Sequence, residues 1–118
     1  MEGFDMAKTT VLAMNYENSD NIEIQGKREQ IQEHINNGYY IQEQRKGYYL
    51  LVKSSKIIVT LSNDDLTKTF NMKADILNYY EKQRLNETLF EKFKQDVEDG
   101  TISFTLDSNE NYSLINNL

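Results

Sequence analysis

The chain of 118 residues contains no cysteine, no proline and no tryptophan, and it has one histidine and five glycines. Without cysteine, the protein has no disulfide framework, thiolate zinc site, thiol nucleophile or iron–sulfur cluster. Five glycines leave little room for a glycine-rich phosphate loop, and neither that motif nor the spacing of an EF-hand is present. These absences exclude several common classes of redox, metal-binding and nucleotide-binding protein.

Catalytic residues are also scarce. The single histidine, His34, has Glu33 beside it but no nucleophile at a recognisable spacing. The acidic pairs 64–65 and 98–99 fall at expected helix ends, where capping explains them and, for the pair 64–65 at an N-terminal end, the helix dipole as well. We therefore predict that the protein is not an enzyme and binds no metal or cofactor. The enzyme hypothesis that stays open is a small metal-dependent hydrolase, which would need a pocket with at least three convergent carboxylates.

Long apolar segments are missing as well. The longest unbroken run is "YYLLV", far short of the roughly 20 residues that a membrane span requires. The start, "MEGFDMAKTTVLAMNYE", has no positively charged segment leading into a long apolar one. We therefore expect a cytoplasmic protein without membrane contact. With 38% hydrophobic and 27% charged residues, the chain suits one globular domain over residues 1–118.

Charge is unevenly distributed along the chain. The net charge is −6, which alone would repel a phosphate backbone. The segment between positions 39 and 62, however, contains four basic residues and one acidic residue. Its net charge is therefore +3, and that of the remainder is −9. This asymmetry indicates a positive region on an acidic protein.

The hydrophobic patterns predict an α+β fold with mostly antiparallel strands. Period-2 alternation and turn residues predict strands, whereas apolar residues three and four apart predict helices. The expected elements begin with strands at 9–16 and 22–24, which could pair as a hairpin, and a helix at 27–36. Strands follow on both sides of turns at 45–47 and 54–55, and then a short helix with Ser62 or Asn63 as its N-cap. The last expected elements are a helix at 73–85, a helix that has Asn86 as its N-cap and ends just before Gly100, and strands at 101–106 and 112–115.

The segment "NGYYIQEQRKGYYLLVKSSKIIVTLS", which carries the doublet Gly-Tyr-Tyr twice, predicts two consecutive hairpins. A three-residue loop at 45–47, with Gly47 in the left-handed conformation, would place Gln44 opposite Tyr48 and Tyr40 opposite Val52. A two-residue loop at 54–55 would place Val52 opposite Ile57. Opposed residues share a face, so the expected core face is Tyr40, Tyr48, Leu50, Val52, Ile57, Val59 and Leu61, interrupted by Gln42 and Gln44.

The opposite face, which we call the mixed face, combines aromatic, aliphatic and basic residues: Tyr39, Ile41, Glu43, Tyr49, Leu51, Lys53, Lys56, Ile58 and Thr60. Either helices cover its apolar centre or the face receives a partner. Nucleic-acid-binding sheets stack bases on aromatic rings and hold phosphates with cations. We predict that RNA stacks on Tyr39 and Tyr49, and that its phosphates contact Arg45, Lys46, Lys53 and Lys56. Strand propensity alone also explains the tyrosines, and protection of sheet edges explains the lysines. The main alternative is a protein-binding module that acts on a transcription factor or another protein. The sequence leaves the oligomeric state open.

From "TTVLAMNYENSDNIEIQGKREQIQEHINNGYYIQEQ" through "EKFKQDVEDGTISFTLD", the chain resembles the PrgU family of small regulatory proteins from pheromone-responsive conjugative plasmids of enterococci. The likeness extends over nearly the whole chain in length, order of elements and an Asn-, Tyr- and Lys-rich composition. It implies a PUA-like pseudo-barrel with peripheral helices. It also implies a cytoplasmic regulator that limits expression of plasmid-encoded surface adhesin and conjugation genes. In the protein-binding alternative, the partner would be a transcription factor or another plasmid protein.

Overall fold

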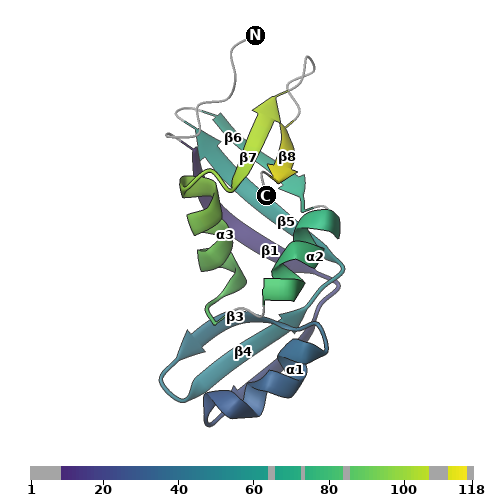
Figure 1. The fold of residues 1–118 in the computed structure, drawn as a ribbon, viewed down its shortest axis with the longest axis vertical. Helices are drawn as coiled ribbons and strands as arrows, with labels where there is room; N and C mark the ends of the chain where they lie inside the picture. Colours follow the sequence, from purple (N-terminus) through teal and green to yellow (C-terminus); the bar gives the residue numbers. More distant parts are fainter. Residues whose placement is uncertain (1–8, 64–65, 73, 84–85, 107–111, 117–118) are drawn as a thin grey trace.

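The computed structural model describes residues 9–63, 66–72, 74–83, 86–106 and 112–116. The chain forms a mixed α+β structure with antiparallel strands, as predicted, and extends over 50 × 25 × 24 Å (Figure 1). In chain order the elements are β1 (Thr9–Glu17), β2 (Asp20–Gln25), the 3₁₀ helix η2 (Arg28–Ile31), α1 (Gln32–Asn36), β3 (Tyr40–Arg45), β4 (Tyr48–Lys53), β5 (Lys56–Asn63), β6 (Leu66–Asn71), α2 (Ala74–Gln83), α3 (Leu89–Glu98), β7 (Ile102–Leu106) and β8 (Tyr112–Asn116).

The described strands form three sheets, with strand orders β1-β5-β6, β2-β4-β3 and β7-β8, and do not close into a barrel. Two long chain segments, 9–25 and 48–63, run antiparallel through both larger sheets. In one sheet β1 pairs with β5 from Thr9 opposite Asn63 to Glu17 opposite Lys56. In the other sheet β2 pairs with β4, beginning at Asp20 opposite Lys53. The two sheets are therefore consecutive parts of one kinked two-stranded ribbon, formed by segments 9–25 and 48–63. A third strand is added to each part: β6 in the first sheet and β3 in the second.

This pairing corrects two predicted hairpins. The turn at 54–55 does not fold β5 back onto β4, because β4 pairs with β2 and β3 whereas β5 pairs with β1 and β6. Likewise, β2 does not pair with β1. The β1–β2 and β4–β5 connections each link one sheet to the other, so Val52 is not opposite Ile57. The turn residues predicted a change of direction correctly but could not specify the partner strand.

The predicted β3–β4 hairpin forms with a different register. Its loop has two residues, Lys46 and Gly47, so Arg45 rather than Gln44 lies opposite Tyr48. Gly47 has the predicted positive φ, at 72°. A bulge between Ile41 and Glu43 adds one residue to β3, and the predicted pair of Tyr40 with Val52 is thereby restored.

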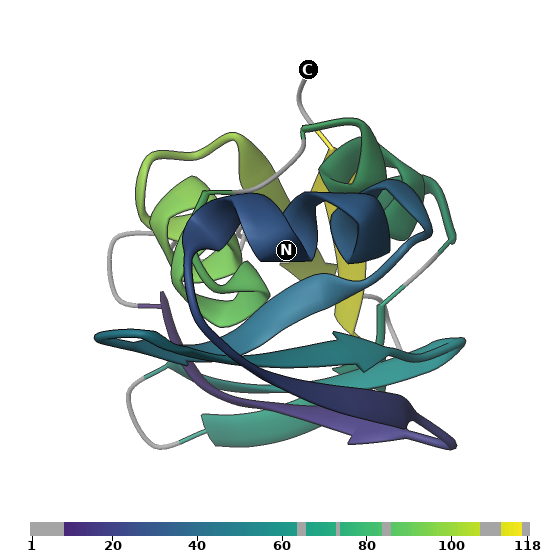
Figure 2. The same ribbon diagram turned by 90° about the horizontal axis from the view of Figure 1, so that it is seen from below.

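The main hydrophobic core lies between the β1-β5-β6 sheet, α2 and α3. In Figure 2 both helices lie on the same side of this sheet, and no described helix covers its opposite face. Of the predicted core face, Tyr40, Val52, Ile57, Val59 and Leu61 are buried here. Tyr48 and Leu50 are half-buried and belong to neither core cluster, so that part of the prediction is wrong.

A second, smaller core lies under η2 and α1. Ile41 and Leu51, predicted on the mixed face, are fully buried there against Ile31. Tyr39 and Tyr49 are half-buried and pack against the same three residues. A helix thus covers the apolar centre of the face on which we expected a partner to bind.

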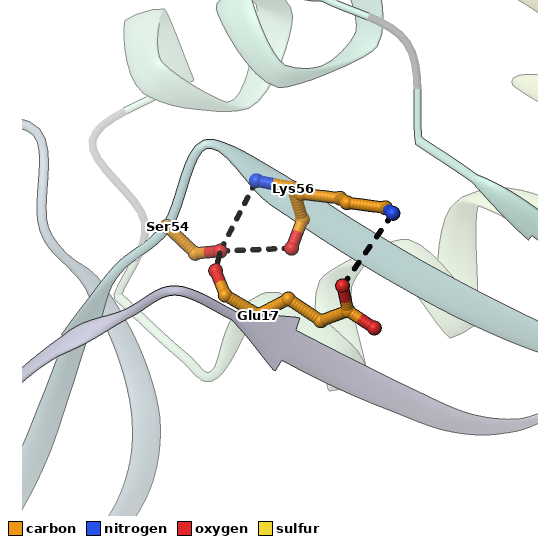
Figure 3. Close-up of polar contacts among 3 residues, drawn as sticks. All are labelled: Glu17, Ser54 and Lys56. Atoms are coloured by element: carbon orange, nitrogen blue, oxygen red, sulfur yellow. Dashed lines mark hydrogen bonds and ion pairs between the residues drawn. The ribbon is translucent and has the colours of Figure 1, made fainter.

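The kink between the two sheets is held by Ser54 (Figure 3). Its hydroxyl oxygen lies 2.6 Å from the carbonyl oxygen of Glu17 and 2.8 Å from that of Lys56, and it accepts a hydrogen bond from the Lys56 N–H at 3.2 Å. The Lys56 ammonium pairs with the Glu17 carboxylate at 3.5 Å. On the other segment, Asn18 adopts a positive φ of 49°.

Most remaining elements match their predicted positions, with two corrections. Residues 66–71 form a strand instead of a short helix, because Thr67 and Thr69 favour extended backbone and β5 offers a free edge. The N-cap of α3 is Thr88 rather than Asn86, and its hydroxyl accepts a hydrogen bond from the Glu91 N–H at 3.1 Å. Residues 64–65, also expected in that short helix, lie outside the described part of the chain.

Candidate nucleic-acid interface

Tyr39 and Lys53 come together beside the end of α1. The Lys53 ammonium lies 5.8 Å from the centre of the Tyr39 ring, in a cation–π contact. A Cβ placed on Gly38 would lie 3.5 Å from Cε of Lys53, so the lysine stem runs close to the backbone that precedes β3. His34 meets the same ring edge-on, with 5.8 Å between ring centres. Lys53 itself is exposed.

Arg45 forms a second cation–aromatic pair, with Tyr48. Its guanidinium lies 4.4 Å from the centre of the Tyr48 ring, and its Nε lies 3.1 Å from a carboxylate oxygen of Glu43. The Tyr48 hydroxyl donates to Glu23 at 3.3 Å. Tyr48 was predicted in the core; it does share a face of β4 with the buried Val52, but it lies beside the hairpin turn, outside both core clusters, and is only half-buried.

The other predicted contacts are placed differently. Tyr49 lies opposite Gln44 and therefore on the other face of the hairpin from Arg45 and Tyr48. Lys46 is exposed in the tight turn. Lys56 belongs to β5 in the other sheet, where it pairs with Glu17. The structure thus brings together Tyr39 with Lys53 and, separately, Arg45 with Tyr48, and does not gather all six predicted residues on one face.

The local charge differs from that of the rest of the chain. Residues 20–53, which we call the hairpin lobe, contain five acidic and five basic residues, so the whole net charge of −6 lies outside them. Within this lobe the β3–β4 hairpin carries Arg45, Lys46 and Lys53 against Glu43 alone. A polyanion that approaches this hairpin therefore meets less repulsion than elsewhere.

A polar groove lies where the hairpin lobe meets α2. Three adjoining hollows share Glu81: two are open to solvent, with volumes of ≈ 480 and ≈ 260 Å³, and the third, at the inner end, has a volume of only ≈ 10 Å³. We call this the waist groove. Its polar lining comes from α1 and the following turn, from α2 and from the end of β4: Asn36, Asn37, Asn78, Glu81, Lys82 and Lys53. Ile35, Tyr39 and Tyr40 line its inner end.

Several of these polar groups are available for a ligand. Within the described part of the chain, the side chains of Asn37, Asn78, Glu81 and Lys82 form no hydrogen bond or ion pair. Asn36 is engaged, since its side-chain oxygen accepts from Gln32 at 3.0 Å. The sequence signal for this site was the spacing of 78, 81 and 82, which puts three polar residues on one face of a helix.

The described residues provide no grouping of three or more histidine or acidic side chains that could hold a metal ion. Within the same residues, no helix has the length and apolar character needed to cross a membrane. The three-carboxylate pocket that a metal-dependent hydrolase would require is therefore not found in the described part of the molecule.

Comparison with known proteins gave no match: no protein-family model, no curated protein and no solved structure is significantly similar to the chain. The chemistry of the hairpin and of the waist groove therefore carries the functional argument.

Proposed function

We propose that the protein is a non-enzymatic, cytoplasmic regulator that binds single-stranded RNA through the β3–β4 hairpin. The observation that carries this proposal is the presence of two cation–aromatic pairs on one hairpin, Lys53 with Tyr39 and Arg45 with Tyr48. Proteins that bind single-stranded RNA stack bases on aromatic rings and guanidinium planes and hold phosphates with cations. The hairpin offers each of these groups.

The cations are free to exchange their present contacts for phosphate. The side chain of Arg45 is 65% exposed and that of its partner Glu43 is 48% exposed. An ion pair this exposed contributes little to stability, so a phosphate can replace the carboxylate at low cost. Lys46 is exposed and has no ion-pair partner among the described residues.

The regulatory role belongs to the same proposal. The resemblance to the PrgU family implies control of plasmid-encoded adhesin and conjugation genes, and RNA binding is a direct way to exert it. A PUA-like arrangement is also part of the proposal, supported by the mixture of antiparallel strands and peripheral helices.

The test is RNA binding measured over a series of salt concentrations. A labelled single-stranded RNA of mixed sequence is titrated with the wild type and with Arg45→Glu, Lys46→Glu and Lys53→Glu, and binding is followed by fluorescence anisotropy. Each lost phosphate contact should weaken binding and reduce the salt slope by about 0.7. Lys94→Glu, on α3, makes the same charge change outside the hairpin and should leave both quantities nearly unchanged.

Two results would contradict the proposal. If the hairpin variants bind as the wild type does, the RNA contact lies elsewhere. If the wild type binds no RNA but forms a ribonuclease-insensitive complex with a protein from its host, the protein-binding alternative is correct.

A further inference from the structure

We propose, on the basis of the RNA-binding function above, that the waist groove selects a base that carries an exocyclic amino group and discriminates against uracil. The groove and the hairpin are connected, because Lys53 contacts the Tyr39 ring and also lines the groove. A phosphate held by Lys53 therefore places its nucleotide at the groove. The ligand of the groove is therefore a base of the RNA strand that the hairpin binds, and not a free nucleotide.

Glu81 determines the selectivity. It lines all three hollows of the groove, it is exposed, and it has no hydrogen-bond or ion-pair partner among the described residues. An ionised carboxylate accepts hydrogen bonds and cannot donate them. Adenine and cytosine present an amino group to such an acceptor, whereas uracil, like thymine, presents a carbonyl oxygen at the equivalent position. The carboxylate therefore accepts a hydrogen bond from the amino group of the first two bases, whereas uracil offers it only N3–H, which lies between two carbonyl oxygens that the carboxylate repels.

The surrounding groups complete a base-binding site. Asn37 and Asn78 each offer an amide donor and an amide acceptor, which suit the remaining edge positions of a base. Lys82, adjacent to Glu81 on α2, supplies a second cation for phosphate. Tyr40 and Leu77 line the same hollow as Asn37, Asn78 and Lys53, and they give an apolar wall for the base itself.

The experiment compares labelled oligoadenylate, oligocytidylate and oligouridylate of equal length by fluorescence anisotropy. The wild type should bind oligoadenylate or oligocytidylate at least about fivefold more tightly than oligouridylate. Glu81→Gln replaces the acceptor by an amide of the same shape, and it should bring oligouridylate to within about twofold of the preferred RNA. The ratio between RNAs is the readout, since it cancels the general gain in affinity from removing a negative charge.

Two further variants complete the design. Asn78→Ala should reduce affinity for the preferred RNA without changing the salt slope, because it removes no charge. Glu98→Gln makes the same chemical change as Glu81→Gln, at an exposed position of α3 outside the groove, and should keep the wild-type ratio. Circular dichroism of each variant establishes that it is folded.

The outcomes separate this inference from the proposed function. Equal binding of all three RNAs by the wild type overturns the inference and leaves RNA binding intact. A preference that Glu81→Gln retains also overturns it, because another part of the protein then reads the base. If the wild type binds none of the RNAs, both proposals fail.

Discussion

The hydroxyl of Tyr80 donates a hydrogen bond of 2.5 Å to Oδ2 of Asp96 inside the main core, where both residues are 1% exposed. The bond joins α2 to α3. The other carboxylate oxygen, Oδ1, pairs with the Lys92 ammonium at 3.1 Å. Burial, and then this hydrogen bond, raise the pKa of Tyr80 far above its ordinary value. Both oxygens of a buried carboxylate thus have a partner, which is the condition under which burial of such a group is tolerated.

The first prediction concerns this pair. Tyr80→Phe leaves Oδ2 of Asp96 buried without a donor, and it should lower the free energy of unfolding by about 2 kcal/mol. Urea denaturation followed by circular dichroism measures the change. Tyr79→Phe is the matched control, because no described residue hydrogen-bonds to the Tyr79 hydroxyl. Equal stability of the two variants would show that the Tyr80 bond contributes nothing to the core.

Most helices and strands could be predicted because each is indicated by the pattern of apolar residues within its own segment. Alternation identified β4 and β5, and the apolar residues from Leu89 to Val97 identified α3. The partners of the strands were not predictable in the same way. A short polar turn such as Ser54-Ser55 has the same composition whether it closes a hairpin or connects two sheets, and the choice depends on β1 and β2, far away in the chain.

The candidate site was predicted in part for a similar reason. Lys53 and Tyr39 were named from composition, and they do meet, through the pairing of β3 with β4. Tyr48 was missed because it shares a face of β4 with the core residue Val52, and the alternation of residues does not reveal that the turn end of the hairpin lies outside the main core. The waist groove depends on contact between the hairpin lobe and α2, and no short segment of sequence encodes such a contact.

The second prediction concerns pH. Tyr40 is 9% exposed, and its hydroxyl donates to the carbonyl oxygen of Leu77 at 3.0 Å. Burial, and then the charge of Glu81, raise the pKa of Tyr40 from 10.0 to about 12. Between these values the unfolded chain has lost a proton that the folded protein keeps. The resulting stability is complete below pH 10 and is lost as the pH rises through 12.

The Tyr40→Phe variant isolates this contribution. The free energy of unfolding of the wild type should fall by about 2 to 3 kcal/mol more than that of the variant when the pH is raised from below 10 to near 12. Urea titrations at several pH values in this interval measure the difference. Parallel pH profiles of the two proteins would mean that the Tyr40 hydroxyl ionises equally easily in the folded and unfolded chain.

The third prediction concerns the kink of the ribbon, where Asn18 has a φ of 49°. Asparagine and glycine tolerate this left-handed conformation, whereas other residues are destabilised by roughly 1 to 2 kcal/mol. Asn18→Ala should therefore lower the free energy of unfolding by about 1 kcal/mol, and Asn18→Gly should stay close to the wild type. Asn15→Ala, at an exposed position of β1, makes the same side-chain change where the backbone is extended and should cost much less. An equal loss of stability in Asn18→Gly and Asn18→Ala would contradict this prediction. It would show that the asparagine side chain, and not its tolerance of a positive φ, stabilises the connection between the two sheets.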